Sequence, residues 1–253
     1  MKKIFVALTL AICLLLALTA CGGDKTPPTE NPGNSDSPVT TNEPKQDDTK
    51  APQIDADTPI TEELLRSYPE TPASDFEYDE WPDSVTINKY IGSDLVVVIP
   101  REINGKPVTE LPGYMFSNDS TVRAVRYPDT IEEVAAAFAN NDNVEIVIFE
   151  GTKRIEEMTF FGCSSLHTVI FDKDLEELSP NGTFVGCSNL SKLYIPDSLS
   201  NIEAPSGDYI VKNDAGEKIV NIFFGCDNLV IYGEAGSYIE TYAKEQGIAF
   251  QAE

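Results

Sequence analysis

The clearest copy of a repeated phrase runs Phe184-Val185-Gly186-Cys187-Ser188-Asn189-Leu190-Ser191-Lys192-Leu193-Tyr194-Ile195-Pro196-Asp197. A phenylalanine stands six residues before an apolar residue, and a short strand-like phrase follows. This spacing recurs at Phe116 and Val122, Phe138 and Val144, Phe160 and Leu166, Phe184 and Leu190, and Phe223 and Leu229. A second apolar pair then follows, three residues apart, at Ile131/Val134, Ile155/Met158, Leu175/Leu178 and Leu199/Ile202. The copies are 22 to 24 residues apart until an insertion at about 203–220 lengthens the last one.

A period of this length, with apolar residues at fixed positions, predicts a leucine-rich-repeat solenoid. Each unit is too small to bury its own apolar face, so neighbouring units must stack and share one core. We therefore expect about five repeats in a β-rich α/β superhelix, with parallel strands, short turns and a C-terminal capping helix. The phenylalanines should form a spine through its core.

The repeats resemble those of the BspA-like leucine-rich repeat proteins of bacterial and protist surfaces. Ile99-Pro100 and residues 103–108 look like the first repeat of that family, while residues 184–190 and 194–198 look like its consensus. Residues 231–244 are similar to its closing segment, and the resemblance extends from Phe76 to Phe250. The sequence departs from the pattern where Gly-Cys is replaced by Asn118-Asp119 and by Asn140-Asn141, which predicts looser turns. The resemblance implies a binding protein exposed on a cell surface.

Two segments are placed to cover the ends of the stack, where open edges would otherwise invite aggregation. Residues 76–78 and 85–90 are predicted to be strands over the first repeat. Residues 236–246 are predicted to form a helix with Tyr238, Ile239, Tyr242 and Ala243 on one face. Gly247 stands where a helix C-cap is expected.

The N-terminus reads as an export signal. Met1-Lys2-Lys3 is a positive start, and residues 4–18 form an apolar run that is short for a membrane span. Leu18-Thr19-Ala20-Cys21 resembles a bacterial lipobox, in which the cysteine becomes the new N-terminus and carries lipid such as palmitate. We therefore expect export and anchoring through Cys21 to the outer face of the bacterial cell membrane; an uncleaved anchor is the alternative.

The domain organisation follows from these segments. Residues 1–20 are the predicted signal peptide, 21–60 the lipid anchor and a disordered spacer, 61–90 an N-terminal capping segment, and 91–253 the repeat domain with its C-terminal cap. The spacer prediction rests on composition, because a polar segment rich in Pro, Thr, Asn and Asp cannot bury enough surface to order itself.

The formal charge of −24 argues against nucleic acid and anionic membrane surfaces as partners. We expect a monomer that uses no cofactor and holds no metal ion. Cys163, Cys187 and Cys226 share one repeat position, which indicates buried thiols; a disulfide between Cys163 and Cys187 is the alternative. His167 is interpreted as a surface residue, because no motif of nucleophilic catalysis accompanies it.

Acidic pairs recur beside the second apolar pair of successive repeats, at Glu132-Glu133, Glu156-Glu157 and Glu176-Glu177. They are interpreted as solvated turn residues. Carboxylates that collect calcium or act in general acid–base catalysis are the alternatives.

The outward side of the strands is the predicted binding surface. If alternate residues point inward, the outer row comprises Val98, Arg126, Ile148, Ile170 and Tyr194, with Val96, Ala124, Ile146, Thr168 and Lys192 beside it. An apolar stripe of this kind is typical of a recognition surface. It also arises where parallel strands simply favour β-branched residues on both faces.

These features favour a non-enzymatic binding or adhesion module for an extracellular protein or glycan. A structural lipoprotein that organises the envelope of its own cell is the alternative. An enzyme ranks third, because the sequence has no nucleophile elbow, phosphate loop or metal-ligand spacing.

Overall fold

The computed structural model describes residues 52–202, 215–216 and 221–253, which all belong to one compact unit, Asp47–Glu253. The predicted signal peptide, Cys21, the spacer up to residue 51 and most of the insertion lie outside these described residues. Within the described ranges, no helix has the length and apolarity needed to cross a membrane.

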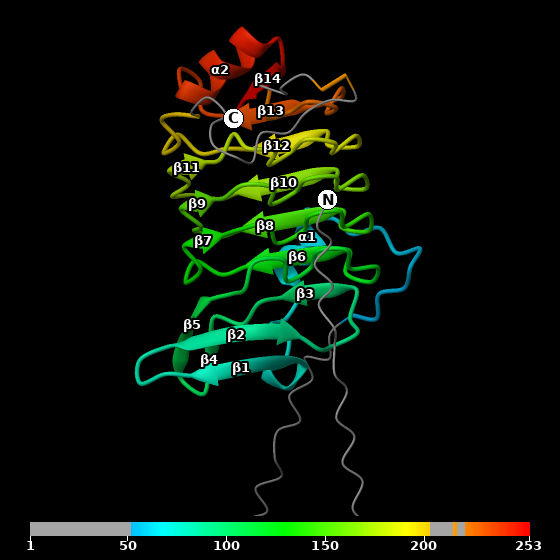
Figure 1. Ribbon diagram of the computed structural model, residues 1–253, viewed down its shortest axis with the longest axis vertical. Helices are drawn as coiled ribbons and strands as arrows, with labels where there is room; N and C mark the ends of the chain where they lie inside the picture. The colour runs from blue at the N-terminus through cyan, green and yellow to red at the C-terminus, as the bar shows by residue number, and fades with distance from the viewer. Residues whose placement is uncertain (1–51, 203–214, 217–220) are drawn as a thin grey trace, which may run out of the picture. The chain divides into compact units, whose positions relative to one another are not determined.

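A parallel β-solenoid forms the body of this unit, as predicted (Figure 1). Its seven-stranded sheet takes one strand from each successive turn, in the order β14-β13-β12-β10-β8-β6-β3. The strands are β3 (Val96–Val98), β6 (Ala124–Tyr127), β8 (Ile146–Phe149), β10 (Thr168–Phe171), β12 (Lys192–Tyr194), β13 (Val230–Gly233) and β14 (Ala249–Ala252). A second sheet joins β7 (Glu133–Val134), β9 (Arg154–Ile155) and β11 (Glu177–Leu178). Ile155 pairs with Val134 and Leu178, the second members of their predicted pairs, so the predicted pair Ile155/Met158 was placed three residues too late.

The predicted phenylalanine spine is confirmed. Phe160 lies between Phe138 and Phe184, with both ring centroids 5.2 Å away and the rings nearly parallel. The stack continues to Phe116 at one end and Phe223 at the other, each 5.4 Å from its neighbour. Aromatic pairs at this distance add stability beyond the area that they bury. The spine therefore ties each turn to the next.

The turns that lack Gly-Cys are not looser, so that prediction is wrong. Asn140 takes the left-handed conformation (φ 56°) that Gly162 takes in the next turn (φ 72°), which asparagine tolerates best after glycine. The side chain of Asn141 replaces the cysteine: its Oδ1 accepts from the amides of Asn143 and Val144, and its Nδ2 donates to the carbonyl oxygen of Phe116. The side chain therefore makes the bonds that close the turn.

Strands at the N-terminal end cover the first repeat, as predicted. β1 (Phe76–Glu80) pairs antiparallel with β2 (Val85–Tyr90), which pairs in parallel with β5 (Lys106–Glu110); β4 (Glu102–Ile103) completes this sheet. A short 3-10 turn, Ala73–Asp75, precedes β1. The side chains of Phe76, Val85 and Ile87 are buried in the same core as the repeats.

The C-terminal helix α2 (Tyr238–Gln246) also forms as predicted, with Ile239 and Ala243 fully buried. Ser237 caps its start, and Gly247 ends it in the left-handed conformation (φ 69°). The chain then returns as β14, which pairs in parallel with β13. The last strand of the sheet is therefore β14, and α2 packs against the core beside it.

Candidate functional site

The candidate site is the side of the seven-stranded sheet that faces away from the phenylalanine spine. The central residue of each strand, such as Val97 or Val147, belongs to the core, so its two neighbours point to the other side. One outer row pairs Val98, Arg126, Ile148, Ile170, Tyr194 and Tyr232 in register. The second row pairs Val96, Ala124, Ile146, Thr168, Lys192 and Val230. Both predicted rows are confirmed, and we call them together the outer strand face.

A segment of the chain itself covers much of this face. We call residues 54–68 the strap. It includes helix α1 (Glu62–Ser67), which lies beside β6 (Figure 1). Thr61 caps the helix, its Oγ1 accepting from the amide of Leu64, and the first turn carries two glutamates. These are the expected features of a helix start.

The strap buries its apolar side chains on the outer strand face. Ile60, Leu65 and Tyr68 form a hydrophobic cluster with Val96, Val98, Ala124, Ile146, Ile148 and Ile170. Only 2 % of Val98, none of Ile148 and 4 % of Ile170 is exposed. The prediction that these three residues present an open recognition surface is therefore wrong, because the strap's apolar side chains cover them and exclude solvent.

Arg126 of β6 and Arg123, which directly precedes that strand, hold the strap by its backbone. Arg123 donates to the carbonyl oxygens of Asp55 (2.9 Å) and Thr58 (3.0 Å). Arg126 donates to those of Arg66 (2.7 Å) and Tyr68 (3.0 Å). The predicted site residue Arg126 thus has a positioning role toward the strap. Arg123 was not predicted, because its partners lie more than sixty residues away along the chain.

One ion pair joins the strap side chains to the edge of the sheet. The guanidinium of Arg66 donates two hydrogen bonds to the carboxylate of Asp172, at 2.8 and 2.6 Å. These bonds raise the pKa of Arg66 above its ordinary value. A bidentate pair of this kind fixes orientation as well as charge.

The structure also corrects the predicted limit of the spacer. The spacer was drawn to residue 60, but Ile60 is buried and Ile54 packs against the same cluster. The hydroxyl of Tyr68 donates to the carbonyl oxygen of Pro52 (3.1 Å). Composition indicates only whether a segment can fold alone, whereas these residues are ordered by the sheet beneath them.

The outer strand face is less covered toward its C-terminal end. Tyr194 is half-buried, and its ring stacks on that of Tyr232 on the next strand, with centroids 4.6 Å apart. Lys192 beside them is exposed. Of the five predicted site residues, Tyr194 alone combines an apolar side chain with access to solvent.

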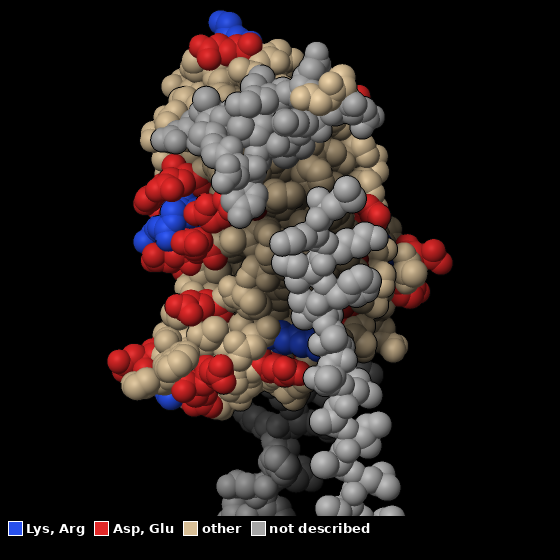
Figure 2. Space-filling view, in the orientation of Figure 1, with Lys and Arg blue, Asp and Glu red and all other residues tan. Residues whose placement is uncertain are grey.

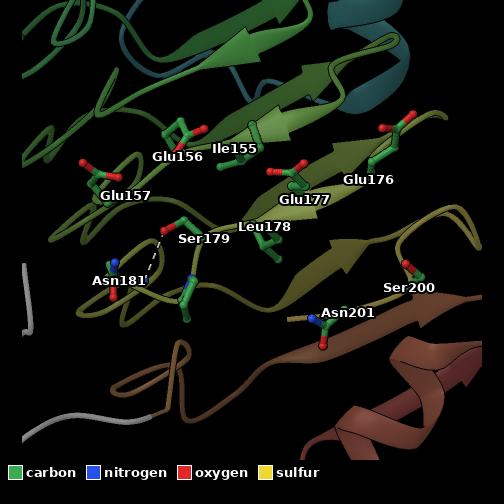
Figure 3. Close-up of a pocket in the computed structure, with 11 residues that line it drawn as sticks. Ile155, Glu156, Glu157, Glu176, Glu177, Leu178, Ser179, Asn181, Ser200 and Asn201 are labelled. Atoms are coloured by element: carbon green, nitrogen blue, oxygen red, sulfur yellow. Dashed lines mark hydrogen bonds between the residues drawn. The ribbon is translucent and has the colours of Figure 1, made fainter. Parts of the chain in front are cut away.

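Acidic side chains gather on a different edge of the unit, along β7, β9 and β11, with basic side chains among them (Figure 2). Lys153 donates to Glu132 (2.7 Å), and Arg154 pairs with Glu133. The glutamates of β7 and β11 and those beside them are solvated, as interpreted, but Glu133 and Glu177 lie in strands and not in turns. Glu156 and Glu157 are half-buried. An open groove of about 580 Å³ lies beside them, lined by Ile155, Glu156, Glu157, Glu176, Glu177, Leu178, Ser179, Pro180, Asn181, Ser200 and Asn201 (Figure 3).

Of the glutamates that line this groove, Glu156 has a carboxyl pKa raised above its ordinary value. Partial burial is the main cause, and the charges of Glu133 and Glu157 add to it. Among the described side chains, no cluster of histidine, cysteine, aspartate or glutamate has an arrangement that could hold a metal ion.

The three repeat cysteines are buried free thiols, as predicted. The Sγ atoms of Cys163, Cys187 and Cys226 donate to the carbonyl oxygens of the phenylalanines one turn away, at 3.1, 3.0 and 3.2 Å. Burial raises the pKa of the Cys187 thiol well above its ordinary value, which suppresses the reactive thiolate. All three cysteines therefore close turns through their side-chain hydrogen bonds.

His167 is half-buried, with Nδ1 2.8 Å from the hydroxyl of Thr168. Burial lowers the pKa of His167, so the ring is neutral at pH 7.

Comparison with known proteins agrees with this fold. The model of the BspA type leucine rich repeat region matches residues 101–206 in six copies. The leucine rich repeat protein of T. pallidum has a similar structure, with 24% identity, a TM-score of 0.53, and 65% of this chain and 71% of that chain covered.

Two further crystal structures are more distant. A leucine rich cell surface protein from Faecalibacterium prausnitzii A2-165 is 16% identical over 66% of this chain and 71% of that chain, with a TM-score of 0.38. The pneumococcal vaccine antigen PcpA is 14% identical over 72% of this chain and 49% of that chain, with a TM-score of 0.43. No curated protein matches. Over residues 101–206, the chain is therefore similar to the BspA type leucine rich repeat region, and its fold is that of a bacterial leucine-rich repeat protein.

Proposed function

We propose that this chain is a lipid-anchored, non-enzymatic binding module of the bacterial cell surface. Its N-terminal leader exports it, lipid on Cys21 holds it to the outer face of the membrane, and its repeat domain contacts an extracellular protein or glycan. The lipobox-like Leu18-Thr19-Ala20-Cys21 supports the anchor. Several acyl chains hold a protein firmly, because each buried methylene contributes about 0.8 kcal/mol.

The outer strand face is the observation that carries the binding role. The strands are already held by the phenylalanine core on their other side, so the solenoid itself needs no apolar residues here. Nevertheless, the face carries isoleucine, valine and tyrosine from β3 to β13. An apolar row of this length indicates contact with another chain segment or ligand. The strap meets part of it, and the Tyr194–Tyr232 pair remains accessible.

A substitution at the accessible end tests this role. The double variant Tyr194→Asp/Tyr232→Asp places two charges where a ligand would meet the rings, and the control Tyr114→Asp changes a tyrosine that is 64 % exposed in a turn. Purified protein is screened against extracellular matrix proteins and cell-wall glycans. We expect the double variant to lose at least tenfold in affinity for the ligand found, and the control to keep it. Equal binding by all three proteins would refute a role for this face.

The anchor is tested separately, with Cys21→Ala in the producing cell. We expect the wild-type chain in the membrane fraction, with the mass of a diacylated or triacylated cysteine at its N-terminus. The variant should lack that mass and leave the membrane fraction. An unmodified wild-type chain of the same mass as its sequence would contradict the anchor.

A further inference from the structure

The strap has the properties of a bound peptide. Its hydrophobic cluster with the outer strand face is separate from the core that holds the repeats together. Removing the strap would therefore leave the phenylalanine spine and the inward-facing strand residues in place. Local units of this kind open independently of the rest of a protein.

The contacts on the strap's backbone are indifferent to its side chains. The hydrogen bonds that Arg123 and Arg126 donate to the strap all end on carbonyl oxygens; the two guanidinium groups also pair with Glu145 and Glu150, which lie outside the strap. Any segment with the same backbone path offers these acceptors, because every residue has a carbonyl group. The arginines thus require a particular backbone conformation of the bound segment, and the apolar cluster requires a particular spacing of its apolar side chains.

Side chains supply the specificity. Ile60, Leu65 and Tyr68 are buried on the sheet, and Leu64 packs partly against it. Arg66 adds a basic group that meets Asp172. The face therefore fits a nine-residue segment that is helical at positions 3 to 8, with apolar residues at positions 1, 6 and 9 and a basic residue at position 7.

The less covered, C-terminal end of the face supplies a route of entry. Tyr194 adjoins the strap cluster and continues into Tyr232 without interruption. An incoming segment can contact these rings first and then displace the strap from the adjoining β10 and β8. The apolar surface continues beyond the covered part, as expected of a site that accepts something longer than the strap.

We propose that the strap is a displaceable occupant of a peptide-binding surface, which takes an amphipathic helical segment of a partner protein with this pattern. This inference rests on the proposed function of the outer strand face as a binding site, and it adds the class of ligand and its regulation. The strap blocks the site in cis, because a tethered segment competes at an effective concentration of about a millimolar. A partner segment must therefore bind the face tightly enough to displace the strap at that effective concentration.

A fluorescein-labelled peptide of residues 52–70 is the probe, and all proteins are the full chain in detergent micelles, with empty micelles as the blank. The double variant Ile60→Ser/Leu65→Ser weakens the strap, and Glu63→Ser changes an exposed residue of the same helix as the matched control. Faster trypsin cleavage after Arg66 confirms that the strap is released. We expect the peptide to bind the released variant at least ten times more tightly than the wild type or the control.

A third protein, with Ile148→Ser added to the released variant, locates the site. It should lose at least fivefold in peptide affinity, since Ile148 lies under the strap. Failure of the peptide to bind the released variant, or equal binding of a scrambled peptide, would overturn the proposal. If release instead enhances binding of a glycan and not the peptide, the assigned ligand class is wrong. If a ligand binds the wild type and the released variant with equal affinity, the proposed function would stand and this inference would be overturned.

Discussion

Leu65→Ala should release the strap without unfolding the repeats. Leu65 is fully buried between α1 and the outer strand face, so the substitution removes its apolar contacts and leaves a cavity. Leu→Ala in a core costs about 2–5 kcal/mol, and the lower half, about 2–3 kcal/mol, applies here because one short helix can settle into the space. At about 1.4 kcal/mol for each factor of ten, the open population should rise about 30- to 140-fold.

Limited trypsin digestion measures this population. Arg66 is held by Asp172 in the closed strap and becomes available when the strap opens. When opening and closing are faster than cleavage, the rate of cleavage after Arg66 follows the open fraction. We therefore expect the rate to rise by the same factor in Leu65→Ala. Glu63→Ala, on the exposed side of α1, should change it less than threefold.

Two results would refute this reasoning. Equal cleavage rates in the two variants would show that Leu65 does not hold the strap. A fall in the global unfolding midpoint as large as that caused by a spine substitution would show that the strap and the repeat core unfold together. The separation of their hydrophobic clusters predicts that the midpoint moves little.

Three further predictions concern the repeats. Phe160→Ala should lower the free energy of unfolding by about 4 kcal/mol, and Phe224→Ala, at a residue 49 % exposed, by less than about 0.5 kcal/mol; urea titration compares them. Gly162→Ala should cost more than the 1–2 kcal/mol or so of its left-handed backbone, because its new Cβ would lie 2.9 Å from Oδ1 of Asn140 and that side chain would have to move. Gly105→Ala, with a similar φ and open space around it, should cost only the backbone part. Glu156→Gln should stabilise the protein at pH 7 by less than about 1 kcal/mol, since this carboxyl is only partly buried and solvent screens its charge. Folding raises the pKa of Glu156, so the folded state binds the proton more tightly and its stability falls as the pH rises through that raised pKa. The stability advantage of the variant in thermal melts should therefore fade as the pH is lowered. A difference that stays constant with pH would contradict this assignment.

The periodic sequence predicted the repeat fold well, because each feature repeats a local rule. A phenylalanine six residues before an apolar residue recurs often enough to locate the spine, and alternation along each strand placed Val98 and Ile148 in one outer row. The C-terminal helix was equally predictable, since Gly247 marks its end. The paired asparagines were misjudged, because the repeat consensus carries no information on how Asn141 closes a turn through its own side chain.

The candidate site was predicted only in part. Thr61 followed by two glutamates and two leucines is a readable helix start, and this signal was missed in a stretch otherwise dominated by polar residues. Even with the helix recognised, nothing local shows what it covers. Its apolar side chains meet residues 30 to 110 positions away, and Arg123 bonds across a similar distance.

By itself, the sequence determined that the chain folds as a stack of repeats, and which strand residues point outward. Local periodicity and short motifs suffice for both. Only the tertiary structure decided that the outward face is occupied by the strap. Burial is a property of the whole fold: an isoleucine on an outer row is exposed or hidden according to where a distant segment comes to rest.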